Sequence, residues 1–286
     1  MKLPPFDYLA PRSLGEATRI LAESGGAARV LAGGQSLMPV MAFRLATPEK
    51  LVDLRHVPGL SGIEIGPREA RIGAMTRWRD IEESDALAAA LPVLRAAIGH
   101  VAHYQIRNRG TIGGSLAHAD PAAEMPAVAV TLDAMIDIAG NSGTRSIPAA
   151  ELFAGALETS LAQDEIITAV RFPLWPAGRR WAFLEFARRR GDFALAGVVV
   201  TYDAGADGRV ANARVGVFGA TDIPRRLAAA EAALNGSRLD DLTLASACEA
   251  ASAAVNPPSD IHGDADYRRS LVGTLLGRAL RSTLPV

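Results

Sequence analysis

The segment from Pro173 to Arg180 separates two stretches of different pattern, and this division constrains the fold more than any other feature. It contains Pro173, Pro176 and Gly178, residue types that interrupt regular structure. Before it, short apolar runs alternate with helical patterns, which is typical of a mixed α/β arrangement. After it, strand patterns come first and helical patterns follow. The sequence therefore predicts an α/β part up to residue 176 and a separate α+β domain over residues 177–286.

The α/β part contains short elements and one unusual stretch. Ser13 and Glu16 have the spacing of a capping box and predict a helix that Gly25 and Gly26 end. We expect strands at 28–32 and 51–54, a hairpin over 62–73, helix over 78–98 with a break near Pro92, and strands at 134–139 and 166–172. Residues 103–124 are polar and lack periodicity. We expect them to form a long ordered loop, and such loops are usually functional.

Beyond residue 177, the patterns predict a small sheet followed by helices. Strands are expected at 181–188, 197–202 and 210–218, with a turn at Asp207-Gly208 before the last of them. Helices are expected near 225–235, 241–254 and 265–281.

Two glycine pairs share one chemical design. Gly33-Gly34 is followed by Gln35-Ser36, and Gly113-Gly114 is followed by Ser115. Paired glycines allow positive φ and close approach to a ligand, and successive amides in such a turn can form a concave anion-binding site. Two such turns would hold the two phosphates of a dinucleotide without lysine. The simpler interpretation of each pair alone is a tight turn.

Other nucleotide motifs do not occur in the sequence. There is no Gly-x-Gly-x-x-Gly fingerprint and no P-loop. Asp120, followed by Pro121 and Glu124, suits a helix N-terminus, and its carboxylate would also suit a sugar hydroxyl.

Composition excludes several classes of protein. Cys248 is the single cysteine, so an internal disulfide or a cluster held by four cysteines of this chain cannot form. The net charge of -1 gives no support for nucleic-acid binding. No signal segment or transmembrane run is evident, and we expect a cytoplasmic protein.

The two glycine motifs also carry a resemblance to a known family. Residues 32–39 and 111–121 resemble the FAD-binding medium subunits of the molybdenum hydroxylase family, which includes xanthine dehydrogenase and aerobic carbon monoxide dehydrogenase. The start of the chain, residues 164–167 and residues 188–194 are similar to the family as well, so the resemblance covers nearly the whole chain. It implies a fold of the vanillyl-alcohol-oxidase (PCMH) type with two α/β subdomains, residues 1–55 and 56–176, and a C-terminal α+β domain, residues 177–286.

The resemblance also implies which residues contact the cofactor. Residues 32–36 and 111–115 would surround the pyrophosphate, Asp120 would hold the sugar-like chain, and residues near Ile167 and 188–194 would approach the isoalloxazine. The expected FAD-binding residues are Ala32, Gly33, Gly34, Gln35, Ser36, Leu37, Thr111, Ile112, Gly113, Gly114, Ser115, Ala117, His118, Asp120, Ile167, Asp192 and Phe193. We expect non-covalent FAD, because nothing marks any of the five histidines as an attachment site. The family often has a lysine where Glu185 stands, so no flavin-tuning cation is carried over to that position.

The family implies a function in electron transfer. Its FAD subunit receives electrons from an iron–sulfur small subunit, a molybdopterin large subunit oxidises the substrate, and the assembly is a dimer of heterotrimers. Two alternatives stay open: a stand-alone flavoprotein oxidase on the same fold, and a non-enzymatic flavin-binding or assembly module. We find no catalytic triad and no metal site; His100 and His103 have helical spacing but are interpreted as packing or surface residues.

Five arginines lie near the segments that carry the resemblance. Arg107 and Arg109 precede the second glycine pair and would face either a phosphate, a partner subunit or solvent. The run 188–190 would be either a solvated run or part of the site.

Overall fold

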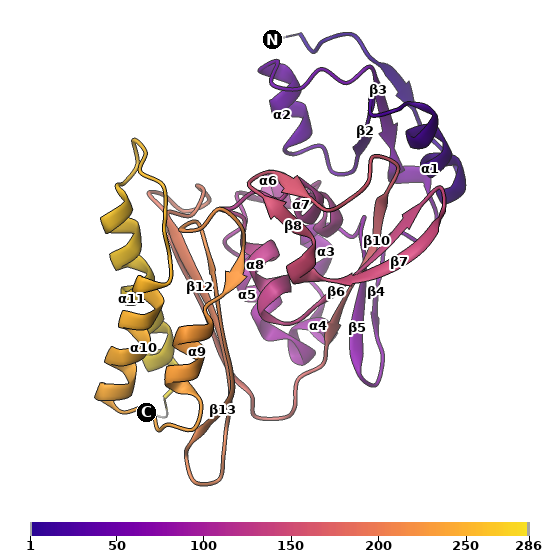
Figure 1. The fold of residues 1–286 in the computed structure, drawn as a ribbon. Coiled ribbons are helices and arrows are strands. Elements are labelled where there is room, and N and C mark those ends of the chain that lie inside the picture. Colours follow the sequence, from indigo (N-terminus) through magenta and orange to yellow (C-terminus); the bar gives the residue numbers. More distant parts are fainter. Residues whose placement is uncertain (1, 285–286) are drawn as a thin grey trace.

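The computed structural model describes residues 2–284, and its chain begins with a small parallel sheet of order β1-β3-β2 (Figure 1). The elements of this unit are β1 (Asp7–Leu9), α1 (Leu14–Glu23), β2 (Ala28–Leu31), α2 (Leu37–Ala42), β3 (Lys50–Asp53) and the 3-10 turn η1 (Leu54–His56). Ser13 caps α1 by accepting a hydrogen bond from the amide of Glu16, and Glu16 accepts one from the amide of Arg12. The predicted cap is therefore present, with its second bond one residue earlier than in the standard box.

The second unit is a five-stranded antiparallel sheet of order β4-β5-β10-β6-β7 with helices packed against it. Its strands are β4 (Ile63–Ile65), β5 (Glu69–Gly73), β6 (Met135–Gly140), β7 (Gly143–Pro148) and β10 (Ile166–Pro173), with a small hairpin of β8 (Phe153–Gly155) and β9 (Glu158–Thr159) and the 3-10 turn η2 (Ala149–Glu151). Its helices are α3 (Trp78–Glu82), α4 (Asp85–Ala90), α5 (Pro92–Ile98), α6 (Tyr104–Arg107), α7 (Ile112–His118) and α8 (Glu124–Thr131). Residues 125–131 of α8 are all buried, which makes this helix the centre of the largest core.

The prediction of one long loop over residues 103–124 is wrong. Thr111 caps α7 through its side chain, which accepts a hydrogen bond from the amide of Gly114. Ile112 and Leu116, one helical turn apart, are both fully buried. The cap and this apolar pair stabilise a short helix where the two glycines weaken the sequence pattern.

The third unit is an antiparallel sheet of order β11-β12-β13-β14 whose outer face is covered by three helices (Figure 1). Its elements are β11 (Arg180–Phe186), β12 (Ala196–Ala204), β13 (Val210–Phe218), β14 (Arg225–Arg226), α9 (Ala228–Leu234), α10 (Asp241–Ala253) and α11 (Ala265–Ser282). The other face packs on the second unit, since Phe183, Val199 and Phe218 belong to the core built around α8. Side chains alternate along β11, so Glu185 lies on the same face as Phe183. Within the described residues, none of the helices combines the length and the apolar character that a membrane-spanning helix needs.

Candidate functional site

The two glycine segments come from different units and lie against each other. A Cβ atom at Gly33 would overlap with the carbonyl oxygen of Arg109 and with the Cα of Gly110. A Cβ atom at Gly114 would lie 3.4 Å from the Cβ of Ala32. The fold therefore places the turn after β2 directly beside the start of α7.

The first glycine segment offers free main-chain donors. It is a turn between β2 and α2, and Gly34 has a φ of 72°, a conformation that favours glycine. In the part of the chain that the structure describes, the amides of Gly34, Gln35 and Ser36 donate to no protein acceptor. The Ser36 side chain is exposed and makes no capping hydrogen bond. These groups match the predicted concave anion site.

The second glycine segment does not repeat this design, and the expectation of a second turn with free amides is wrong. It lies in the first turn of α7, where the amides of Ile112 and Gly113 donate to the carbonyl oxygens of Thr76 and Ala74. The amides of Gly114 and Ser115 donate to the side chain and the carbonyl of Thr111. This segment therefore contributes shape and side chains rather than unpaired amides.

The glycines of the second pair have different roles. A Cβ at Gly113 would overlap with Ala74, so this glycine allows α7 to pack on the segment after β5. Gly114 faces the first glycine segment, as described above. Of the two, only Gly114 lies at the boundary between the segments.

Asp120 follows α7 and lines a cleft. Ala119 ends the helix in the left-handed conformation, with φ of 53°. The Asp120 carboxylate accepts a hydrogen bond from the amide of Ala122, at 2.9 Å. The helix α8 begins only at Glu124, with Ala123 as its N-cap, so the interpretation of Asp120 as a helix cap is wrong. Its carboxylate closes a short turn at the cleft and has a second oxygen free of that bond.

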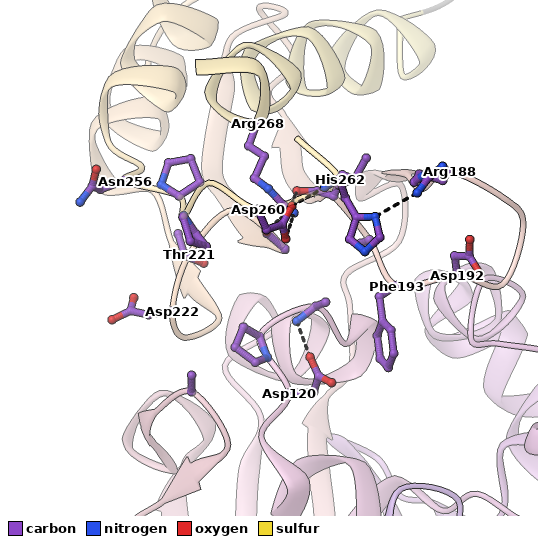
Figure 2. Close-up of a pocket in the computed structure, with 18 of the residues that line it drawn as sticks. Asp120, Arg188, Asp192, Phe193, Thr221, Asp222, Asn256, Asp260, His262 and Arg268 are labelled. Atoms are coloured by element: carbon purple, nitrogen blue, oxygen red, sulfur yellow. Dashed lines mark hydrogen bonds and ion pairs between the residues drawn. The ribbon is translucent and has the colours of Figure 1, made fainter. Parts of the chain in front are cut away.

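The cleft lies between this turn and the C-terminal domain (Figure 2) and has a volume of about 970 Å³. Its walls come from the turn at 120–122, the segment 188–195, residues near 219–225 and residues 256–268. Arg268 is buried at the back and donates hydrogen bonds to the carbonyl oxygens of Leu195 and Gly219 and to the carboxylate of Asp260. Arg188 lies 3.1 Å from the ring of His262 across the cleft mouth. A cleft of this size and mixed polarity suits part of a nucleotide cofactor.

Asp192 and Phe193 lie on a turn that rests on the second unit. Gly191 has a φ of 85°, and a Cβ atom there would overlap with the carbonyl oxygen of Ala102 and with the ring of His103. Asp192 is exposed, and the ring of Phe193 is 73% exposed at the cleft wall (Figure 2). The turn therefore presents an aromatic ring to the cleft without burying it in a core.

Arg107 supports the surface under that turn. Its guanidinium forms an ion pair with Glu82 at 3.0 Å and donates to the carbonyl oxygens of Val101 and Ala102. Ala102 has a φ of 42°, which is unfavourable for a residue with a Cβ. Arg107 therefore stabilises a strained backbone, whereas the neighbouring Arg109 side chain is exposed.

The remaining residues predicted to contact FAD differ in how exposed they are. Leu37 and His118 are partly buried, Ala117 is exposed, and Ile167 is buried in the core with 4% exposure. Ile167 precedes a register shift in β10. Its side chain is thus directed into the protein core.

One group of polar residues near the cleft was not predicted as functional. Glu185 on β11 has a side chain that is 3% exposed, and its Oε2 has no hydrogen-bond partner within the described residues. Burial, with the nearby Glu124 charge, raises the pKa of Glu185 to about 8, and burial raises the pKa of Glu124 to about 7. Burial and the Arg190 charge lower the pKa of His100, whose Nδ1 lies 3.8 Å from Glu185 Oε2. The one sign of this group in the sequence is a glutamate within an apolar strand.

Comparison with known proteins gives matches over essentially the whole chain. Residues 4–175 match the model of the FAD binding domain in molybdopterin dehydrogenase, and residues 181–283 match the CO dehydrogenase flavoprotein C-terminal domain. The nicotine 6-hydroxylase medium subunit of Paenarthrobacter nicotinovorans is 45% identical over 280 residues, which is 98% of both chains.

Solved structures agree with these matches. A chain of carbon monoxide dehydrogenase from Hydrogenophaga pseudoflava superposes with a TM-score of 0.97 at 38% identity, covering 99% of this chain and 98% of the other. A chain of quinoline 2-oxidoreductase from Pseudomonas putida 86 gives 0.94 at 40% identity, covering 99% and 98%.

The fold and the matches define a flavoprotein oxidoreductase subunit whose cofactor is FAD. More particularly, the chain belongs to the family of FAD-binding medium subunits of molybdenum hydroxylases, the family of carbon monoxide dehydrogenase and xanthine dehydrogenase. The residues fit the cofactor, since a turn with free amides meets the start of α7 at a contact that admits only glycine, and Asp120, just after the end of α7, lines a cleft.

Proposed function

We propose that the chain binds FAD non-covalently and carries electrons from an iron–sulfur subunit to a terminal acceptor, while a molybdopterin subunit oxidises the substrate. The observation that carries this proposal is the contact between Gly33 and the 109–110 backbone, which brings the free amides of the first turn beside α7. FAD supplies the ability to exchange electrons singly and in pairs. The chain has a single cysteine, so it cannot itself hold a cluster that needs four cysteines.

Within this proposal, each part of the site has its own contribution. The amides of Gly34, Gln35 and Ser36 bind the pyrophosphate, and the hydroxyl of Ser115 completes the contact from α7. Asp120 accepts a hydrogen bond from a sugar-like hydroxyl of the cofactor. The backbone near Ile167, together with Asp192 and Phe193, borders the isoalloxazine.

The other expected contacts remain part of the proposal. Ala32, Leu37, Thr111, Ile112, Gly113, Ala117 and His118 shape the surroundings of the two glycine segments. We also propose that residues 1–55, 56–176 and 177–286 form three units and that the chain joins large and small partners in a dimer of heterotrimers. The cytoplasmic location expected from the sequence stays a prediction.

The test of the site uses flavin content. Gly114→Val brings a branched side chain against Ala32 and Thr111. We expect the purified variant to fold, by circular dichroism, but to lack the visible flavin bands of the natural chain. A variant that retains FAD at the natural stoichiometry contradicts the assignment of this segment.

The test of the subunit role is purification from the source organism. We expect the chain to co-elute with an iron-bearing and a molybdenum-bearing partner. Elution as a lone flavoprotein that oxidises an organic substrate by itself would instead support the stand-alone oxidase. A chain that binds FAD but cannot be reduced by any donor would support the assembly module.

A further inference from the structure

Three titratable side chains lie close together at the boundary between the second unit and the C-terminal domain. None of them is among the residues proposed to contact FAD. Glu185 comes from β11, Glu124 from the start of α8, and His100 from the segment that follows α5. The Glu185 side chain is 3% exposed, and its Oε2 makes no hydrogen bond within residues 2–284. An unpaired buried carboxylate is costly, so such a group takes a proton unless a cation compensates it.

The surroundings provide no such cation. Among the described residues, His100 is the only ion-pair partner of Glu185, and Glu124 has none. Burial and the charge of Arg190, on the 188–191 turn, keep the pKa of His100 low, so the imidazole is not a dependable counter-charge. The strand β12 presents Gly197 opposite Glu185, and Tyr267 of α11 packs on Phe186, which lies on the other face of β11.

The cluster is electrostatically linked to the cleft. Asp120 lines the cleft, and its charge contributes to raising the pKa of Glu124. Ala122, two residues before Glu124, and Arg188, three residues after Glu185, also line the cleft. A charge placed in the cleft at the position of Asp120 therefore acts on Glu124, and the charge of Glu124 in turn acts on Glu185.

We propose that Glu124 and Glu185, beside His100, form an internal proton-binding site that takes up a proton from solvent when negative charge accumulates in the cleft. The proposal rests on the binding of FAD there. Reduction of FAD by two electrons and one proton leaves one additional negative charge on the isoalloxazine. The site binds a further solvent proton as that charge appears and releases it when the electrons leave. The carboxyl pair would thereby limit the change in local charge when bound FAD gains or loses electrons.

The first experiment observes the carboxyl groups themselves. The infrared C=O stretch of protonated carboxylic acids is followed against pH in the full-length chain, with and without FAD. We expect a band that persists at neutral pH and disappears in mildly alkaline buffer. In Glu185→Gln the component that titrates at the highest pH is lost, and in Glu124→Gln the Glu185 component moves to lower pH. Glu249→Gln, on an exposed position of α10, keeps the natural titration. Absence of a protonated carboxyl at neutral pH in the natural chain overturns the proposal.

The second experiment measures the coupling. The midpoint potential of the bound flavin is determined by spectroelectrochemistry across neutral and alkaline pH. We expect its dependence on pH to be weaker in Glu185→Gln than in the natural chain and in Glu249→Gln. If the midpoint potential depends on pH in the same way in all three proteins, the coupling is overturned, whereas the proposed binding of FAD is unaffected. A chain that never retains FAD overturns the proposed function and the coupling with it, while the infrared band still decides whether the carboxyls hold a proton.

Discussion

Gly33 and Arg109 are in direct backbone contact: a Cβ atom at residue 33 would overlap with the carbonyl oxygen of Arg109. This requirement for glycine differs from that at Gly34, where φ is 72°. At Gly33 the reason is close approach of a second chain segment, and at Gly34 it is backbone conformation. The turn that offers free amides is thus held against the start of α7 with no side chain between them.

Replacing Gly33 with alanine should therefore weaken FAD binding. The extra methyl group must displace either the turn or the 109–110 backbone, and overpacking of this kind costs about 1–3 kcal/mol. If FAD binding has to restore the displaced turn, that cost lowers the cofactor affinity by about five- to 150-fold. Isothermal titration of the FAD-free protein with FAD measures it.

The matched control is Gly15→Ala. Gly15 lies in α1, and a Cβ there meets nothing within 4 Å. Alanine at a helical position stabilises by about 0.5–1 kcal/mol, so this variant should gain stability and bind FAD normally. Equal FAD affinity in both variants would show that the Gly33 contact does not shape the site.

Arg107 and Arg109 should differ in their effect on stability. Arg107→Met removes an ion pair with Glu82 and two bonds to the strained 101–102 backbone, so we expect a loss of about 1–3 kcal/mol in the free energy of unfolding. Arg109→Met changes an exposed side chain and should alter stability by less than about 0.5 kcal/mol. Urea denaturation followed by circular dichroism compares them. Equal stability of the two variants would contradict the anchoring role of Arg107.

The sequence predicted elements wherever a run of residues has one buried face. The strands β2, β5, β6 and β10 and the helix α1 were expected on this basis, and the structure contains them. The strands β1 and β7 were not, because β1 has three residues and β7 exposes nearly all of its side chains. Neither pattern differs from that of a polar loop, and only the neighbouring strand makes them part of a sheet.

The candidate site was only partly accessible to sequence reasoning. The two glycine segments stood out by composition, yet their amides are used differently, because Thr76, Ala74 and Thr111 accept those of α7. Which amides remain free depends on residues distant in sequence. The same holds for Glu185, whose burial results from the packing of α5 over β11 and of α8 over the neighbouring strand β12.

Phe193 should matter for the flavin and not for the fold. Its ring is 73% exposed, so Phe193→Ala should change the free energy of unfolding by less than about 0.5 kcal/mol. If the ring borders the isoalloxazine, its loss removes an aromatic contact worth about 0.5–1.5 kcal/mol. We expect weaker FAD retention and stronger fluorescence of the bound flavin. Leu242→Ala, at a position that is 83% exposed on α10, is the control, and matching flavin fluorescence in both variants would exclude the contact.

The carboxyl pair also predicts how stability depends on pH. The pKa values of Glu124 and Glu185 are raised to about 7 and about 8 in the folded protein, from an ordinary value of 4.5. Between pH 4.5 and about 8, the unfolded chain has released protons that the folded chain still holds. The folded state therefore binds more protons, and its stability falls as the pH rises through this interval. Above about pH 8 both states are ionised, and the contribution of the pair becomes constant.

Glu185→Gln should remove the part of this decline that belongs to Glu185, because a glutamine side chain does not ionise. Each unit of pKa difference corresponds to about 1.4 kcal/mol. The free energy of unfolding of the variant, relative to that of the natural chain, should therefore increase steadily from about pH 5 to about pH 8. Its own decline should end near pH 7, where Glu124 completes its titration. The comparison uses urea denaturation midpoints measured across this pH range, with the dependence of the unfolding free energy on urea concentration held the same for both proteins. The control variant Glu249→Gln should follow the curve of the natural chain. A stability difference that is independent of pH would mean that Glu185 is already ionised in the folded protein, and that a partner unrecognised in the structure compensates its charge.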